Sequence, residues 1–392
     1  MLPEVTQIRK QSQQSQFSQK SLVRMYENFV SENASSVSQI ESALRSLTYI
    51  IPGRFKESEL ASESLHSFIQ LLSLYHTSLL SKVYNRLPSS IPRPNPSLHN
   101  RYTKFWSSQS TLYRRIAQLL QIIQYTELLW EMLARRRGQK TRWRVVMLIE
   151  SIKAFCRLLL MRLTNSRPLI HPLLPEREVD PRNALEQEQQ KAASDWNGMD
   201  QNELPEQSNA EINWVMPRTG LSLPTLPNTS DITEYLMKKV LTPDDVKAPK
   251  QLLHKLTTIQ AQAAEIMWIV RPVIYAALLS RYQGSKKSSW TPWLVGVSIE
   301  AAARQLSKNE LSLRIAGGLR GVTGLEKEEI KSRRWNMAWW ALRGAFYENI
   351  TKSWIQGAAG KLKGKMLLDI VATVIEDYDY LWDEYYFSTA TM

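Results

Sequence analysis

The histidines, carboxylates and glycines that could carry out chemistry do not form a known catalytic or metal-binding pattern. The five histidines have no HExxH spacing and no close histidine neighbour, so no metal site is predicted. The acidic pairs Glu328-Glu329 and Asp383-Glu384 lie in aromatic-rich amphipathic segments and suit solvated helix faces. The glycines between 317 and 324 lack the GK[ST] ending of a phosphate loop. The sequence therefore predicts no enzyme, no cofactor, no metal and no small-molecule substrate.

Cations that stand beside tryptophan are the strongest chemical signal in the chain. Phosphate attracts the cations and indole prefers a water–lipid interface, so an anionic phospholipid membrane would satisfy both residue types. Nucleic acid would use only the cations, and no nucleic-acid-binding motif is present. The membrane-contact candidates are Trp268, Arg271, Lys286, Lys287, Trp290, Trp293, Trp335, Trp339 and Trp340. For each group of neighbouring cations and tryptophans taken alone, a helix end exposed to water is the alternative interpretation.

Composition points the same way. The chain has 392 residues, a net charge of +13, 13 tryptophans and one cysteine, Cys156. A single cysteine excludes an intramolecular disulfide and a cysteine-based zinc site. Between Glu176 and Glu234 there are about 12 acidic and 4 basic residues, so the rest of the chain carries about +21. A basic helical body of this kind favours an anionic partner.

The elements that must position these residues are helices, because apolar residues recur at helical spacing and no strand pattern appears. The predicted fold is all-α, a membrane-associated bundle of long amphipathic helices with a disordered acidic linker between two helical halves. The N-terminus has no apolar signal-peptide segment. The predicted divisions are a disordered tail (1–20), an N-terminal half (21–166), the linker (167–230) and a C-terminal half (231–392).

The C-terminal half contains an apolar hairpin, Ile266–Ile299, around a loop with Lys286 and Lys287. Its first arm of about 14 residues would cover about 21 Å, against a hydrocarbon core of about 30 Å. No predominantly apolar segment of 18 residues is recognised, so a conventional transmembrane helix is not predicted. A hairpin buried in a soluble helical core and a hairpin lying at a membrane surface both remain open.

The segment from Gln139 to Thr164 predicts a helix with a broad apolar face. Arg142, Glu150 and Lys153 share a charged edge about 80° wide with Arg157. Such a pattern is typical of an interfacial helix whose edge meets head groups. A core helix with one solvated edge is the equal alternative.

Five motifs in order resemble the peroxin sixteen family of peroxisomal membrane biogenesis proteins, and the chain looks like a fungal-type member. They are LVRMYENFV (22–30), IESALRSLTYIIPGRF (40–55), WIVRPVIY (268–275), SWTPWLVGV (289–297) and RGAFYE (343–348). The resemblance covers about residues 21–165 and 255–387.

This resemblance implies a protein of the peroxisomal membrane, reached in many organisms through the endoplasmic reticulum. It also implies recruitment of other membrane peroxins, with peroxin three and peroxin nineteen as partners. A basic stretch after the early helices is associated with targeting in the family, but here the dense basic run comes later. The targeting candidates are Lys82, Arg86, Arg135, Arg136, Arg137, Lys140, Arg142 and Arg144. A soluble helical adaptor that binds an acidic protein is the alternative function.

Overall fold

The computed structural model describes residues 25–30, 33–50, 59–86, 96–177, 244, 247–282, 290–315, 321–362, 382 and 384–390. These residues form helices and connecting turns without a strand, which confirms the predicted all-α class. The predicted N-terminal tail, the linker beyond residue 177, and Lys286 and Lys287 lie outside this part of the chain.

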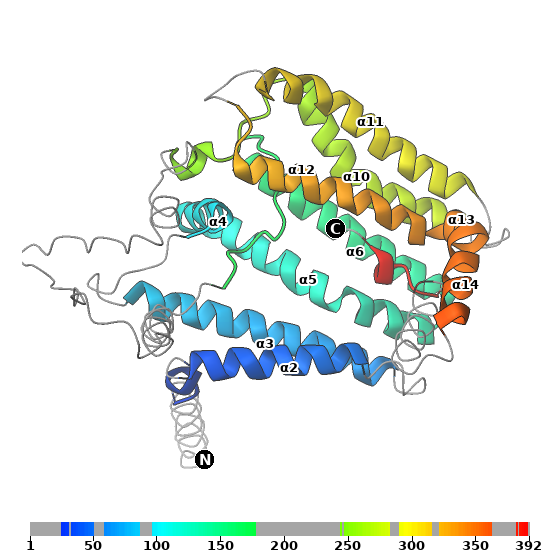
Figure 1. Ribbon diagram of the computed structural model, residues 1–392, viewed down its shortest axis with the longest axis horizontal. Helices are drawn as coiled ribbons and strands as arrows, with labels where there is room; N and C mark the ends of the chain where they lie inside the picture. The colour runs from blue at the N-terminus through cyan, green and yellow to red at the C-terminus, as the bar shows by residue number, and fades with distance from the viewer. Residues whose placement is uncertain are drawn as a thin grey trace, which may run out of the picture.

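Long helices stacked side by side make up the bundle (Figure 1). The first half contributes α2 (Ala34–Ile50), α3 (Glu59–Arg86), α4 (Leu98–Gln109), α5 (Thr111–Arg136) and α6 (Gln139–Leu163). The second half contributes η3 (Pro249–Gln251), α10 (Ile259–Arg281), α11 (Trp290–Ile315), α12 (Gly324–Asn336), η5 (Met337–Leu342), α13 (Gly344–Phe346), the π-helix η6 (Tyr347–Thr351), α14 (Lys352–Leu362) and η7 (Phe387–Thr389).

The α5–α6 hairpin forms where the sequence predicts it. Ser110 caps α5, because its side-chain oxygen accepts a hydrogen bond from the Tyr113 amide (3.2 Å). At the other end the Gly138 amide donates to the Arg135 carbonyl, and the positive φ of Gly138, 125°, lets the chain reverse at once into α6. Glycine therefore fixes the turn that carries the arginine run.

The predicted apolar hairpin is present as α10 and α11, which pack along each other, while α10 also packs on α6. The first arm is longer than expected, because Thr258 caps a helix that begins at Ile259 and continues through Pro272. At 23 residues it is long and apolar enough to cross a bilayer, so the expectation that no such segment exists is wrong. Core helices of soluble proteins meet the same criterion, and 44% of its most apolar stretch is buried.

One core joins the two predicted halves. Tyr102 and Leu160 from the first half pack with Leu252 and Ile269 from the second. Residues 167–177, placed in the linker by the sequence analysis, belong to this core as well. Leu169, Ile170 and Leu173 are buried there. Burial of one such side chain stabilises the fold by about 1.5–3 kcal/mol, so this segment anchors the halves together.

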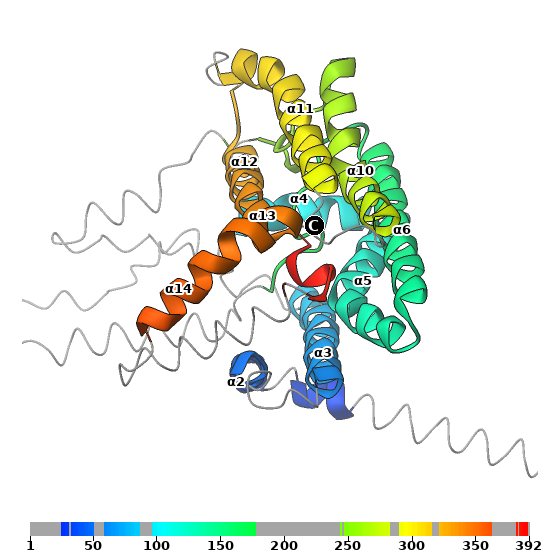
Figure 2. The same ribbon diagram turned by 90° about the vertical axis from the view of Figure 1, so that its right-hand side faces the viewer.

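The helical region from Gly324 to Leu362 is interrupted. Its start, α12, has a capping box in which Thr323 and Glu326 satisfy each other's backbone amides. After η5, Arg343 adopts an extended backbone and Gly344 has a φ of 53°, a conformation that glycine accepts readily. The break turns α13 and α14 away from α12, on the side of the molecule opposite α6 (Figure 2).

Candidate functional site

Three of the membrane-contact candidates are interior residues. Trp268, Arg271 and Trp340 are 6%, 2% and 4% exposed. Arg271 on α10 forms an ion pair with Glu300 on α11, and the Trp340 indole donates to the same carboxylate (2.6 Å). A buried charge requires such partners, so this arginine ties α10 to α11.

A second ion-pair cluster ties α10 to α12. The Arg333 guanidinium bonds the Glu265 carboxylate at 2.7 and 2.9 Å and lies 3.9 Å from the Trp268 ring centroid. Arg333 also donates to Glu329, which accepts a hydrogen bond from the His171 amide (3.3 Å). Glu265 and Arg271, the two charged residues within the apolar run of α10, are therefore bound inside the bundle.

The remaining tryptophans among these candidates lie nearer the surface. Trp293 is half-buried, stacks on Phe346 at 5.3 Å, and donates from its indole to the Trp340 carbonyl (2.9 Å). Trp339 is also half-buried, whereas Trp290 is 38% and Trp335 72% exposed. Membrane contact by these residues stays a prediction, and Trp290 and Trp335 are the two with accessible rings.

The targeting candidates divide in the same way. Arg135 pairs with Glu384, and Arg142 donates to Glu131 at 2.8 Å. The others with a described side chain are exposed, and all but one surround the α5–α6 turn. They are Lys82, Arg136, Arg137, Lys140 and Arg144.

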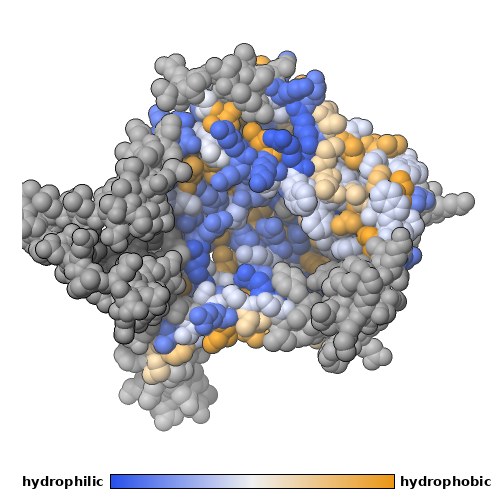
Figure 3. Space-filling model, viewed as in Figure 1, coloured by the Kyte–Doolittle hydropathy of each residue, from blue (hydrophilic) through white to orange (hydrophobic). Residues whose placement is uncertain are grey.

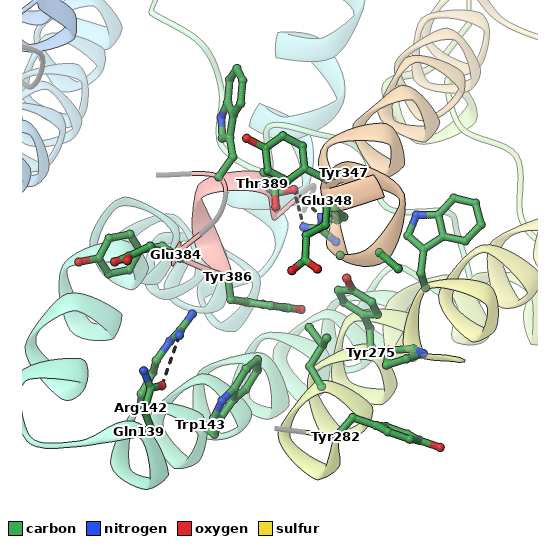
Figure 4. Close-up of a pocket in the computed structure, with 18 of the residues that line it drawn as sticks. Gln139, Arg142, Trp143, Tyr275, Tyr282, Tyr347, Glu348, Glu384, Tyr386 and Thr389 are labelled. Carbon is green, nitrogen blue, oxygen red and sulfur yellow. Dashed lines mark hydrogen bonds between the residues drawn. The ribbon is translucent and has the colours of Figure 1, made fainter. Parts of the chain in front are cut away.

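The structure brings Arg135, Arg142 and Trp293 together at a pocket of about 360 Å³ (Figure 4). In Figure 4 its wall comes from Trp143 of α6, Tyr275 of α10, η6 and the C-terminal residues. This pocket holds aromatic rings and paired charges, so it suits an apolar or aromatic group with a polar end.

The C-terminal segment forms one wall of this pocket through backbone bonds that the sequence analysis did not foresee. The Tyr386 and Phe387 amides donate to the Glu131 carboxylate at 2.8 and 2.9 Å, and Arg343 donates to the Thr389 carbonyl at 2.8 Å. No local pattern signals a contact between positions 255 residues apart. The local signal is that Glu131 falls among the buried residues of α5 such as Tyr113 and Leu120.

The charged edge of α6 is buried, contrary to both interpretations of this helix. Glu150 and Lys153 are each 1% exposed and Arg157 is 4% exposed. The Lys153 ammonium donates to Glu127 of α5 at 2.8 Å and to Glu150 at 3.3 Å. Burial raises the pKa of Glu127 to about 7, although the Lys153 charge acts to lower it. These charged residues therefore bind α6 to α5 and do not contact solvent.

Within the described residues no three histidine, cysteine or acidic side chains are arranged to hold a metal ion. Cys156, the one cysteine, is buried. The acidic side chains described above pair with arginine, lysine or histidine of neighbouring helices. Such ion pairs hold helices together and do not form a recognised proton-transfer site.

A helical bundle with an apolar helix of spanning length and tryptophans at its surface is an all-α protein whose structure is compatible with membrane association. A family model described as Peroxisomal membrane protein (Pex16) matches residues 24–384. This chain therefore belongs to the Pex16 family, which confirms the resemblance, the role in peroxisome biogenesis and the location at the peroxisomal membrane.

Two relatives agree with this family over most of their length. Peroxisomal membrane protein PEX16 of Schizosaccharomyces pombe is 21% identical over 81% of this chain and 84% of the relative. Peroxisome biogenesis protein 16 of Arabidopsis thaliana is 22% identical over 86% of this chain and 91% of the relative. No solved structure matches the chain.

Proposed function

We propose that this chain is a non-enzymatic assembly factor that recruits other membrane peroxins to the peroxisomal membrane. Peroxin three and peroxin nineteen are the partners that the family resemblance implies, and passage through the endoplasmic reticulum stays a prediction. The observation that carries the proposal is a pair of exposed indoles, Trp335 on α12 and Trp354 on α14, which are 72% and 74% exposed.

Exposed tryptophans of this kind are typical anchors of protein interfaces, where a few aromatic residues supply most of the binding energy. Lys331 and Arg334 are exposed beside Trp335, one turn before it and next to it in sequence. A polar, charged rim around an aromatic anchor matches the anatomy of a protein–protein interface. Its positive charge favours an acidic partner segment.

The face of the molecule that carries α12, shown in Figure 3, is compatible with a protein partner. This face is mostly hydrophilic at its centre and is hollowed there, with hydrophobic residues gathered toward one end. Such a surface stays stable in water, so it is available for reversible docking.

The test measures binding of the purified chain to purified peroxin three from the same organism. With Trp335→Ala and Trp354→Ala combined, we expect affinity to fall by about thirtyfold, equivalent to about 2 kcal/mol. Trp130→Ala is the matched control, because Trp130 is 55% exposed on α5. Unchanged affinity of the double variant, with circular dichroism unchanged, would refute the docking role of these indoles.

A further inference from the structure

The outward side of α6 is apolar although its inward side is charged. Leu148, Ile152 and Phe155 are 58%, 38% and 63% exposed. Their spacing of four and three residues places them on one side of the helix. Lys153 and Arg157 point the other way and are buried. This is the reverse of a helix on a water-soluble protein, where charges face out and apolar side chains face in.

The neighbouring helix α5 has the same reversed pattern. Leu119, Trp130 and Leu133 are 44%, 55% and 38% exposed on one side of it. Glu127 and Glu131, which face into the bundle, are 6% and 0% exposed and are bound to cations of α6. Two adjacent helices therefore bury their carboxylates and present leucine and indole outward.

The third helix, α10, also turns apolar side chains outward and charged side chains inward. Ile259, Ile266 and Ile274 are 86%, 40% and 37% exposed, whereas Glu265 and Arg271 are bound inside. α10 packs on α6, and α6 packs on α5. Figure 2 shows the three on one side of the molecule, away from α12 and α14. We define the outward apolar face as Leu119, Trp130, Leu148, Phe155, Ile266 and Ile274.

Exposed cations lie at both ends of this face. Arg136 and Arg144 flank the α5–α6 turn, and Arg281 is the last residue of α10, next to Tyr282, which lines the 360 Å³ pocket together with Gln139. At the other end Arg115 and Arg162 are exposed. Arg162 follows Arg144 by 18 positions, which corresponds to about 27 Å of helix. Positive groups around an apolar area of this length match lipid phosphates around inserted side chains.

We propose that the outward apolar face inserts into one leaflet of the peroxisomal membrane, with α5, α6 and α10 parallel to the membrane plane. The cations around it contact lipid phosphate. On the opposite side, α12 exposes Lys327, Glu328 and Lys331, which need water, so lipid covers one side of the bundle only. The inference rests on the family's membrane location and is independent of peroxin recruitment.

The experiment uses the full chain with a Cys156→Ala background, which removes the one, buried thiol. Single cysteines replace Leu148, Phe155 and Ile266 on the face and Lys331 on α12 as control. Each carries an environment-sensitive fluorophore and is mixed with phosphatidylcholine–phosphatidylserine vesicles. We expect a blue shift and quenching by lipid-linked quenchers at the first three positions and neither at Lys331.

Two results would overturn the proposal. One is the absence of lipid quenching at positions 148, 155 and 266 while the chain floats with vesicles. The other is quenching equal to that at 331. Blue-shifted labels before vesicle addition, without later lipid quenching, would show that a second copy covers the face.

Depth separates insertion in the plane from crossing the bilayer. Labels at positions 259, 266 and 274 should be quenched at the same depth if α10 lies in the membrane plane. Graded depths along α10 would refute the parallel orientation. The pair Leu148→Glu with Phe155→Glu changes exposed side chains only, and we expect vesicle partitioning to fall by more than about tenfold. Trp335→Ala should leave partitioning unchanged, because the proposed orientation turns this membrane-contact candidate away from the lipid.

Discussion

The two sides of this bundle expose different kinds of residue between their ends. On the α5–α6–α10 side, Glu127, Lys153 and Arg271 are buried in ion pairs while leucine and isoleucine face out. On the α12–α14 side, Lys331 and Arg334 are exposed around Trp335. Interior charge is costly unless paired, and exposed apolar surface is costly in water. The proposed insertion accounts for this difference, with lipid on one side and water on the other.

The largest effect should come from breaking the charge network on the lipid side. Lys153→Met leaves Glu127 and Glu150 without their common cation, and we expect a loss of about 3–5 kcal/mol of unfolding free energy at neutral pH. Lys331→Met on α12 removes an exposed ammonium and should change the unfolding free energy by less than about 0.5 kcal/mol. Denaturant unfolding of both variants, followed by circular dichroism, checks the comparison.

If Lys153→Met and Lys331→Met lowered the unfolding free energy equally, the buried and exposed charges of the two sides would not differ in their contribution to stability. Because Glu127 already has a pKa of about 7, the Lys153→Met penalty should also shrink as pH falls below 7. A penalty that does not depend on pH would instead point to lost packing of the lysine stem.

Much of the fold could be predicted from the sequence. Helical periodicity gives the helix class, Gly138 gives the α5–α6 turn, and the apolar run around Trp268 gives one arm of the hairpin. The apolar arm was taken to begin at Ile266 because Gln260 and Gln262 dilute the apolar run before it, whereas the Thr258 cap starts α10 at Ile259.

The direction in which each helix faces could not be predicted. Periodicity shows that Glu150, Lys153 and Arg157 share one edge, but a paired buried edge and a solvated edge have the same spacing. The partner that decides between them, Glu127, lies on another helix. Likewise the wall of the pocket depends on Glu131 reaching backbone amides of the C-terminal segment. Long-range pairs of this kind leave no mark on local sequence.

The next effect in size concerns pH. Burial acts to raise the pKa of Glu329, but the His171 hydrogen bond and the Arg333 charge outweigh it and lower the pKa from 4.5 to about 2. The carboxylate therefore contributes its stability in full above pH 4.5 and loses it as pH falls to 2, which amounts to about 3 kcal/mol. Glu329→Gln should abolish this part of the acid transition.

Glu127 on α5 should make stability depend on pH in the opposite direction to Glu329. Its raised pKa means that the folded state binds a proton more tightly than the unfolded state, so stability should rise as pH falls from about 7 to 4.5. Glu127→Gln should remove that rise and leave the loss below pH 4.5 intact. Unfolding free energies measured between pH 2 and pH 8 separate the two, and a wild-type curve that is flat from pH 7 to 4.5 would contradict the assignment.

The smallest effects should come from the helix caps, one on each side. The Thr323 hydroxyl donates a hydrogen bond to the Leu252 carbonyl (2.7 Å) and accepts one from the Glu326 amide (3.2 Å). Because the Thr323 side chain is fully buried, Thr323→Ala should lower the unfolding free energy by about 2 kcal/mol. Ser110 makes a single cap bond at the start of α5, and Ser110→Ala should cost about 1 kcal/mol. Thermal unfolding in detergent-free buffer and on vesicles checks both. If α5 lies against lipid, vesicles should reduce the Ser110→Ala loss and leave the Thr323→Ala loss as it is, because bound lipid stabilises the folded α5 directly.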